Sequence, residues 1–370
     1  MNRLILIGNG FDLAHGRETS YFHFAYWYLI QAYENSFKNG EYSDGLILIQ
    51  RSGTYTNYSD KEADIKTMID YCLSSDNLRN LFANRQVLIV GLQSYFTLSF
   101  RTNIKNDWFK HLLINCCENG WIDIENEYFK QLKTYLRSNN NKTKKDLAEL
   151  NDALKIIIEK LREHLLLLPK ANKLHSVIDL LQSDLYSRKS AANRLVDLKP
   201  GRTLILNFNY TDTFEQYVSD ALIVLNDIDV TLNYIHGTIK TKSNPMIFGF
   251  GDELDTSYSE MQESEIDGFL DYVKTFWYLR TPNYQELVAF LEEEDYEVII
   301  LGLSCGLSDR TLLHMIFEHD HCKFIKLFHY TDLNGVNNFI QLTHAIARHF
   351  KSNVKLRDRL IPFDIHSQLT

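Results

Sequence analysis

The N-terminal segment joins a short apolar run to a turn rich in glycine and polar residues. Residues 3–7 read Arg-Leu-Ile-Leu-Ile, and residues 8–16 read Gly-Asn-Gly-Phe-Asp-Leu-Ala-His-Gly. Glycines directly after a strand let backbone N–H groups approach a phosphate, and the start of a following helix favours its negative charge. The candidate nucleotide-binding residues here are Gly8, Asn9, Gly10, Asp12 and His15. A plain structural turn fits the glycines equally well, since Leu13 breaks the dinucleotide fingerprint G-x-G-x-x-G.

Amide side chains end a second apolar run, over residues 203–208. Asn207 and Asn209 offer hydrogen-bond donors and acceptors there, and Asn is a poor strand residue that has nothing to cap at position 209. Asp212 and Glu215 follow. They are candidates for ligand contact, and they equally match a helix-capping box that needs no function.

A histidine ends the third run, over residues 230–236. His236 precedes Gly237, which permits a close approach to the ring. A lone histidine is often only structural, but a His-Gly pair at a strand end beside other polar strand ends favours a functional site.

Two further small-residue loops complete the set. One reads Phe-Gly-Phe-Gly-Asp-Glu over residues 248–253, and the other reads Leu-Ser-Cys-Gly-Leu-Ser-Asp over residues 303–309. The candidate binding residues in them are Gly249, Gly251, Asp252, Ser304 and Asp309. Ser308 or Asp309 also fits a helix cap, and we interpret Cys305 as inert.

Acidic and metal-ligating residues raise a different chemistry. Asp123 and Glu127 lie four residues apart at the start of a predicted helix, where acidic residues also simply suit the helix dipole. If such carboxylates faced the site, they would bind a metal or act as acid and base. The cluster His314, His319, His321 and Cys322 lacks the paired spacing of a zinc site.

The elements that must position these residues alternate between strand and helix. After residue 200 we expect strands over residues 203–208, 230–236, 246–248, 298–303 and 324–329, and helices over 212–224, 309–318 and 337–350. Two helical segments near residues 259–277 and 283–294 interrupt them. Alternation of this kind predicts a parallel sheet, whose ligands lie beyond the carboxyl ends of its strands. The strand over residues 3–7 is expected to join this sheet.

Residues 22–198 carry a helical pattern instead. Segments 22–37, 61–73, 107–117 and 123–136 have apolar residues at three- and four-residue spacing, and a longer stripe runs from Leu147 to Leu168 before Pro169. We therefore predict an α/β fold with a Rossmann-like parallel sheet and a large helical insertion after the first strand. The predicted division is residues 1–21 and 200–370 for the core, and 22–199 for the insertion.

Composition narrows the class of protein. The 370 residues are 45% hydrophobic and 24% charged, which excludes disorder for most of the chain. The net charge of −9 disfavours nucleic acid as the default partner. The apolar runs are all too short for a transmembrane helix, and the start lacks signal-peptide features, so we expect a cytoplasmic protein without membrane contact. The five cysteines contain no C-x-x-C pair and are expected to be reduced.

The motifs together resemble a known family. The segments ILIGNGFDLAHG, WIDIE, LNFNYTDTFE, NYIHG and ILGLSCGLSD occur in an order that resembles the AbiH family of bacterial abortive-infection proteins over nearly the whole chain. This resemblance implies antiviral defence that halts phage propagation, with a phage-derived trigger. The motif order also resembles the sirtuin-like NAD-binding domains of other phage-defence effectors.

The sirtuin-like resemblance implies roles for several residues. Gly8 and Gly10 would contact the phosphates of NAD, and Ser304 and Asp309 would touch its adenosine side. Asn209 would orient the ribose or the attacking water, and His236 would act as the base on the ribose hydroxyls. The aspartate expected after Asn-Tyr comes one residue late, at Asp212. The chain lacks a four-cysteine zinc module, which favours hydrolysis of the nicotinamide–ribose bond over deacylation.

Three functions compete at this point. The first is hydrolysis of NAD as the substrate. The second is a nucleotide-sensing module that binds without turnover. The third is a magnesium-dependent nuclease or phosphohydrolase built on Asp12, Asp123, Glu127 and Asp252, the reading under which nucleic acid becomes a partner. The helical insertion is also a candidate homo-oligomer interface, although an ordinary core fits the same residues.

Overall fold

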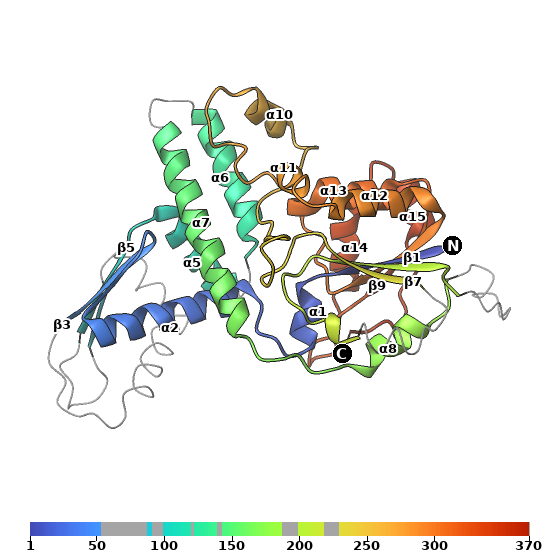
Figure 1. Cartoon of the computed structure of the whole chain (residues 1–370), viewed down its shortest axis with the longest axis horizontal. Helices are drawn as coiled ribbons and strands as arrows, with labels where there is room; N and C mark the ends of the chain where they lie inside the picture. Colours follow the sequence, from blue (N-terminus) through green and yellow to red (C-terminus); the bar gives the residue numbers. More distant parts are fainter. Residues whose placement is uncertain are drawn as a thin grey trace. The chain divides into compact units, whose positions relative to one another are not determined.

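The computed structural model describes residues 1–52, 87–90, 99–119, 122–138, 143–186, 199–217 and 229–369. The chain forms two compact units (Figure 1). Unit 1 comprises Met1–Glu18, Leu168–Glu263 and Tyr272–Thr370, and unit 2 comprises Thr19–Leu167 and Ser264–Asp271. Unit 1 therefore includes the segment from Leu168 onward, which the sequence division assigned to the helical insertion.

A five-stranded parallel sheet is the centre of unit 1. Its strands are β1 (Asn2–Ile7), β6 (Arg202–Asn207), β7 (Asp229–Tyr234), β8 (Tyr296–Leu301) and β9 (Cys322–Phe328). They lie in the order β7-β6-β1-β8-β9. The first strand is thus central, and the order along the sheet reverses beside it, as in Rossmann-like folds. The predicted α/β class and parallel sheet are confirmed, and so is the place of the N-terminal strand in that sheet.

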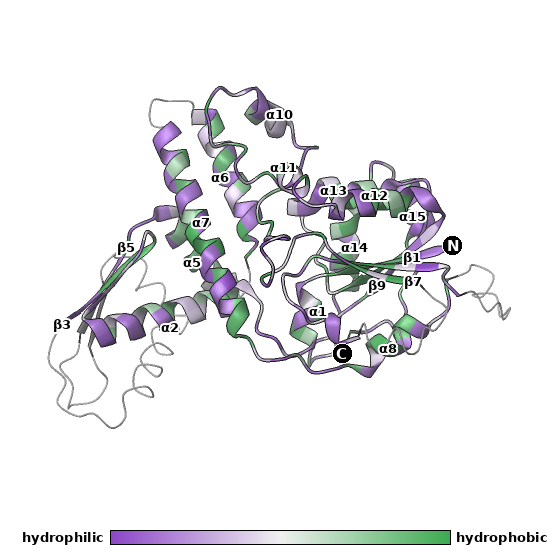
Figure 2. Cartoon of the chain, viewed as in Figure 1, coloured by the Kyte–Doolittle hydropathy of each residue, from purple (hydrophilic) through white to green (hydrophobic). Residues whose placement is uncertain are grey.

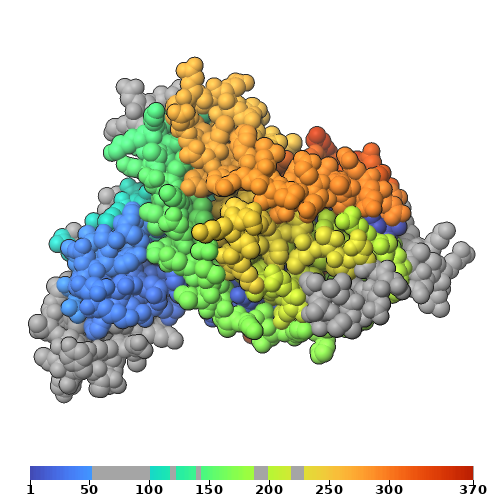
Figure 3. Space-filling view, viewed as in Figure 1, coloured from blue at the N-terminus to red at the C-terminus, as the bar shows by residue number. Residues whose placement is uncertain are grey.

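Both faces of this sheet are covered, which explains why its central strands β1 and β8 are nearly continuous apolar runs that are buried throughout. Leu4 and Leu6 of β1 belong to one hydrophobic cluster, and Ile5 and Ile7 belong to the other. The first cluster includes α12 (Asn283–Glu293), α13 (Arg310–Glu318) and α14 (Phe339–Ala347). The second includes α1 (Asn9–Ala14) and α8 (His175–Gln182). In Figure 3 the orange segment with α12 and α13 lies beside the yellow-green segment around β7.

Shorter elements of unit 1 lie between β7 and the C-terminus. They are α10 (Thr256–Glu263), α11 (Lys274–Tyr278), the 3-10 helix η2 (Leu307–Asp309) and α15 (Asn353–Arg359). The predicted strand over residues 246–248 is wrong, because this segment has no strand pairing. Its apolar residues are explained by burial of Ile247 and Phe248 in a loop. The predicted continuous helix near residues 259–277 is also wrong, since irregular structure separates α10 from α11.

Unit 2 combines helices with a second sheet. Its helices are α2 (Tyr21–Asn39), α5 (Asp107–Asn119), α6 (Ile124–Ser138) and α7 (Thr143–Leu167). Its antiparallel strands are β2 (Glu41–Ser43), β3 (Ile47–Ser52), β4 (Val87–Val90) and β5 (Ser99–Ile104), in the order β2-β3-β5-β4. The four helices agree with the predicted helical insertion, and the antiparallel sheet was not predicted. The predicted helix over residues 61–73 lies outside the described residues.

Helix α7 shows why the helical pattern was nevertheless easy to detect. Its apolar stripe is buried, and hydrophobic and hydrophilic patches alternate along the helix in Figure 2. Leu147, Leu154 and Ile157 are fully buried. Burial of each such side chain contributes roughly 1.5–3 kcal/mol relative to an exposed position. Among the described residues, no helix is both long and apolar enough to cross a bilayer.

Candidate active site

The carboxyl ends of the unit 1 strands are level with one another. Ile7 at the end of β1 pairs in register with Asn207 of β6 and Leu301 of β8, and Asn207 pairs with Tyr234 of β7. The polar residues that follow these strands therefore share one edge of the sheet. The edge includes the position where the strand order reverses, which is the usual ligand site of open α/β sheets.

His236 lies two residues beyond β7 and is buried. Its Nε2 is 3.0 Å from Oδ1 of Asp309 and 3.2 Å from the hydroxyl of Tyr278. Tyr278 stacks on the imidazole, and Phe208 meets it edge-on with ring centroids 5.1 Å apart. These contacts fix the ring in one orientation behind the strand end.

Asp309 connects His236 to a buried lysine. Nζ of Lys274, the first residue of α11, donates to the same Oδ1 of Asp309 at 2.7 Å, and the Lys274 side chain has no exposed surface. Although burial acts to raise the pKa of Asp309, the charge of Lys274 and the hydrogen bonds from His236 and Lys274 outweigh it and hold that pKa below its ordinary value. Burial and then the charge of Lys274 lower the pKa of His236, while Asp309 acts in the opposite direction. Lys274 and Asp309 are therefore paired as opposite charges, and the neighbouring ammonium disfavours a second positive charge on His236.

The two asparagines beyond β6 are also buried and partnered. The backbone N–H of Asn209 donates to Oδ1 of Asn207 at 2.9 Å, and Nδ2 of Asn209 donates to the carbonyl of Gly8 at 3.0 Å. Asn207 thus closes a short turn after the strand. Asn209 links the ends of β6 and β1, which explains an Asn at a position with no helix to cap.

Asp12 is held on the inner side of α1. Its Oδ2 accepts from the Thr211 hydroxyl at 2.5 Å, while its Oδ1 is buried and has no hydrogen-bond partner. Burial raises the pKa of Asp12, and hydrogen bonds from Thr211, Thr213 and Asn209 only partly offset that effect. Burial in this setting acts against the ionised form of the carboxyl.

The N-terminal glycines serve a close approach of two backbones. The N–H of Gly8 donates to the Leu301 carbonyl at 3.0 Å, and the N–H of Gly10 donates to the Gly302 carbonyl at 2.8 Å. A Cβ on Gly8 would lie 2.5 Å from Cα of Leu303. The Gly8 N–H therefore bonds to the end of β8, and the Gly10 N–H bonds to the loop after it, so a phosphate contact through either group requires its hydrogen bond to break. Asn9 between them is exposed.

Both ring nitrogens of His15 are hydrogen-bonded within the protein. Its Nδ1 is 2.6 Å from the Phe11 carbonyl, and its Nε2 is 2.6 Å from the hydroxyl of Tyr217, which also accepts from the backbone N–H of Leu174. Because Tyr217 accepts from Leu174, its own proton is available to Nε2, and the Nδ1 proton goes to Phe11. Burial lowers the pKa of His15, consistent with a neutral ring.

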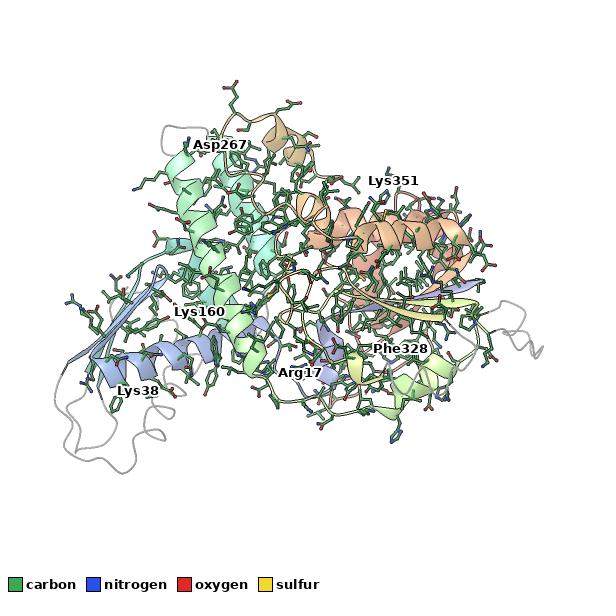
Figure 4. All side chains as sticks on the ribbon, in the orientation of Figure 1. Arg17, Lys38, Lys160, Asp267, Phe328 and Lys351 are labelled. Carbon is green, nitrogen blue, oxygen red and sulfur yellow. The ribbon has the colours of Figure 1, made fainter. Side chains whose placement is uncertain are left out.

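Asp212 belongs to an ion-pair network and makes no side-chain helix cap. Arg17, labelled in Figure 4, donates to its Oδ1 at 2.8 Å, and Nζ of Lys240 lies 2.8 Å from its Oδ2. Lys240 also pairs with Glu215, whose Oε1 accepts from the hydroxyl of Tyr234. The network ties the loops after β6 and β7 together.

The loop with Gly249, Gly251 and Asp252 packs near the buried lysine. The φ of Gly249 is +153°, and a Cβ there would lie 2.0 Å from the Tyr272 carbonyl oxygen. Asp252 is buried, and its Oδ2 lies 3.4 Å from Nη1 of Arg310. Burial raises the pKa of Asp252, against the opposing charge of Arg310. This loop supports the Lys274 side of the site.

The loop after β8 separates its two predicted binding residues. Ser304 is exposed, whereas Asp309 is buried against His236. Cys305 has a left-handed φ of +52° and is buried, and burial raises the pKa of its thiol. The thiol is therefore unsuited to act as a nucleophile, as the sequence indicated.

Residues proposed as metal ligands are occupied elsewhere. Within the described ranges, no group of three or more His, Cys, Asp and Glu side chains is arranged to hold a metal ion. His314 and His321 bond to the carbonyls of His349 and Leu291. In unit 2, Oδ1 of Asp123 accepts from the backbone of Asn126, and Glu127 pairs with Lys130 at 2.6 Å.

Lys274 and Tyr278 are the residues of this site that sequence reasoning missed. Both lie in a stretch interpreted as a continuous amphipathic helix, in which a lysine is expected to face solvent. The available signal was weak: Lys274 is the one cation in the apolar run 269–279. The tertiary fold is what brings it to Asp309, 35 residues later in the chain.

Comparison with known proteins identifies a family. Neither the curated proteins nor the solved structures contain a match to the chain. The family model described as bacteriophage abortive infection AbiH matches residues 4–330, which include residues of all five strands of the parallel sheet. The chain therefore belongs to the AbiH family of bacteriophage abortive infection proteins.

Proposed function

We propose that this AbiH protein acts in phage defence by hydrolysing NAD at the nicotinamide–ribose bond, at the carboxyl edge of the parallel sheet. The observation that carries the proposal is the buried trio of Lys274, Asp309 and His236 directly behind β7. Burying charged groups costs free energy, and such groups with shifted pKa values concentrate at functional sites.

Hydrolysis of the nicotinamide–ribose bond requires polar groups of the kind that lie at this edge of the sheet. The C1′–N bond breaks with its electron pair going to nicotinamide, water adds to C1′, and one proton is released. The transition state is close to an oxocarbenium ion, so it needs a fixed ribose and nearby dipoles more than a strong nucleophile. In this proposal, Asn209 orients the ribose or the water, and His236 accepts a proton from a ribose hydroxyl at the ring nitrogen that does not face Asp309, once that nitrogen has released the backbone of Phe208.

The side chains packed around the His236 ring limit the direction from which a substrate can approach it. Asp309 and Tyr278 lie against Nε2, and Phe208 and Tyr210 pack around the ring, with the Tyr210 centroid 6.4 Å away. Tyr210 is only half-buried, so the substrate would approach on its side of His236. The phosphates of NAD would then lie toward the loop after β8, whose movement would free the N–H group of Gly10.

The test is incubation of the purified protein with NAD, with and without magnesium, followed by chromatography for nicotinamide and ADP-ribose. The key variants are His236→Gln and Asn209→Ala. The matched control is His329→Gln, a buried histidine that follows β9, the outermost strand on the side of the sheet away from β7. We expect product from the wild type and the control, and a loss of at least about 100-fold in His236→Gln, the scale of general-base catalysis. Full turnover in folded His236→Gln removes the assignment.

The same assay separates the other two functions. Tight binding of NAD in calorimetry without any nicotinamide release would favour the sensing module. Release of phosphate or cleavage of DNA that depends on magnesium would favour the metal-dependent enzyme. Circular dichroism of every variant establishes that a loss of activity is not a loss of fold.

A further inference from the structure

The carboxylate of Asp309 receives two donors on one oxygen. Nζ of Lys274 lies 2.7 Å from Oδ1, and Nε2 of His236 lies 3.0 Å from the same atom. The donors come from different elements, since Lys274 begins α11 and His236 follows β7. The side chain of Lys274 has no exposed surface. A lysine is rarely buried to this extent unless it is paired.

The charge balance of this trio decides the state of the histidine. With the ammonium and the carboxylate paired, a neutral His236 gives the trio a net charge of zero. A proton on His236 would add an uncompensated positive charge to a buried site, which is costly. Without Lys274, the carboxylate would instead be available to pair with an imidazolium ion, which cannot accept a proton.

We propose that Lys274 is a positioning residue, which orients His236 through Asp309 and opposes a positive charge on the imidazole. This inference rests on the proposed function for its catalytic consequence, but the state of the ring is measurable without substrate. Lys274 itself does not touch the substrate in this account.

Three aromatic side chains and one backbone group also surround the ring of His236. Tyr278 of α11 lies 3.2 Å from Nε2, and Tyr210 and Phe208 come from the segment after β6. In the described part of unit 1, these aromatic side chains complete the surroundings of the ring that the contacts define. Phenol side chains carry no charge at neutral pH. The backbone of Phe208 also hydrogen-bonds to the ring, which favours its protonated form.

The direct experiment is an NMR titration of His236 in protein carrying ¹³C-labelled histidine. The His236 signal is assigned by its absence in His236→Asn. In Lys274→Met, which keeps the length of the side chain and removes its charge, we expect the titration midpoint to rise by about one pH unit or more, the effect of one close charge. In Asp309→Asn we expect it to fall. In the double variant Lys274→Met/Asp309→Asn we expect it to return toward the wild-type midpoint.

Two results would overturn the proposal: an unchanged midpoint in folded Lys274→Met, or a rise in Asp309→Asn. The Asp309→Asn arm keeps the proposal testable if Lys274→Met does not fold. The catalytic consequence is read from kcat/KM for NAD against pH. Its acid limb should move to higher pH in Lys274→Met while the activity at alkaline pH is retained. A merely structural lysine would lower the activity at every pH without moving the limb.

The two proposals fail separately. A shifted His236 midpoint in a protein that leaves NAD intact would support the positioning role of Lys274 and contradict NAD hydrolysis. NAD hydrolysis with the wild-type midpoint and acid limb in Lys274→Met would contradict the positioning role and leave the proposed function standing.

Discussion

The approach of the β1–α1 turn to the loop after β8 leads to a graded prediction with three glycine-to-alanine variants. Gly302 has a φ of +65°, and a Cβ there would lie 2.1 Å from the backbone N of Phe11. Gly335 has a φ of +80° with nothing within 4 Å of the added atom. Gly8 has an ordinary extended φ of −124°, but its Cβ would lie 2.5 Å from Cα of Leu303. The three positions therefore separate backbone conformation from steric overlap.

The magnitudes follow from these two contributions. Gly335→Ala should destabilise the fold only through the left-handed conformation, by about 1–2 kcal/mol. Gly8→Ala should destabilise it only through steric overlap, by about 1–3 kcal/mol for overpacking against backbone atoms that cannot rotate away. Gly302→Ala combines both effects, about 2–5 kcal/mol, so its destabilisation should approach the sum of the other two.

The assay is urea denaturation at 25 °C, followed by hydrogen exchange of peptides from β1 and β8 so that the signal comes from unit 1. With a denaturant slope of about 3 kcal/mol/M, Gly302→Ala should lower the midpoint by about 0.7–1.7 M and Gly335→Ala by about 0.3–0.7 M. Equal midpoints for these two variants would refute the claim that Gly302 is required for the close approach of the loop after β8 to the β1–α1 turn.

Three further predictions concern the rest of the edge. The raised pKa of Asp12 means that the folded state binds its proton more tightly than the unfolded chain, so its contribution is present below the ordinary value of 3.8 and is lost as pH rises through the raised pKa. The urea midpoint of Asp12→Asn should therefore fall less than that of the wild type between pH 4 and 8, and a parallel fall would contradict this. Tyr217→Phe should lower the free energy of unfolding by about 1–3 kcal/mol, because His15 and the N–H of Leu174 both lose their hydrogen-bond partner. We expect kcat/KM for NAD to be unchanged in this variant. A change in kcat/KM at constant stability would instead assign His15 to the binding site. EDTA should leave NAD hydrolysis unaffected, and activity that magnesium restores would favour the metal-dependent alternative.

The sheet and its polar edge were predictable because strong local signals coincide there. The strands of unit 1 are apolar runs that end in residues unsuited to a strand, such as Gly8, Asn209 and the His236-Gly237 pair. Parallel pairing then brings these residues to one edge, whatever the loops between them contain. The register confirms this part of the reasoning.

The partners of the site residues were not predictable, because they depend on tertiary contacts. Lys274 gives no local sign that it will be buried, and the sequence placed Asp309 beside the adenosine of NAD, whereas its contact in the structure is His236. His15 resembled a ligand residue, but its two ring nitrogens bond to Phe11 and Tyr217. Only the fold shows which polar residues satisfy one another.

The second sheet was missed for a different reason. The Asp44-Gly45 pair between polar and apolar short runs is typical of a tight connection between strands, and the flanking residues form β2 and β3. Oδ1 of Asp44 accepts from the backbone N–H groups of Leu46 and Ile47, which stabilises the turn. The strong helical periodicity on either side led to the interpretation of the whole insertion as helical.

The central claim, that this family member acts through NAD cleavage at His236, is tested most directly inside infected cells, where the trigger is present. Cells carrying the wild type, His236→Gln or the control His329→Gln are infected with a phage that the wild type restricts, and their NAD is measured over time. We expect a fall in NAD and a rise in nicotinamide with the wild type and His329→Gln, and neither change with His236→Gln. Restriction of the phage by the wild type with NAD levels equal to those in His236→Gln cells would contradict it.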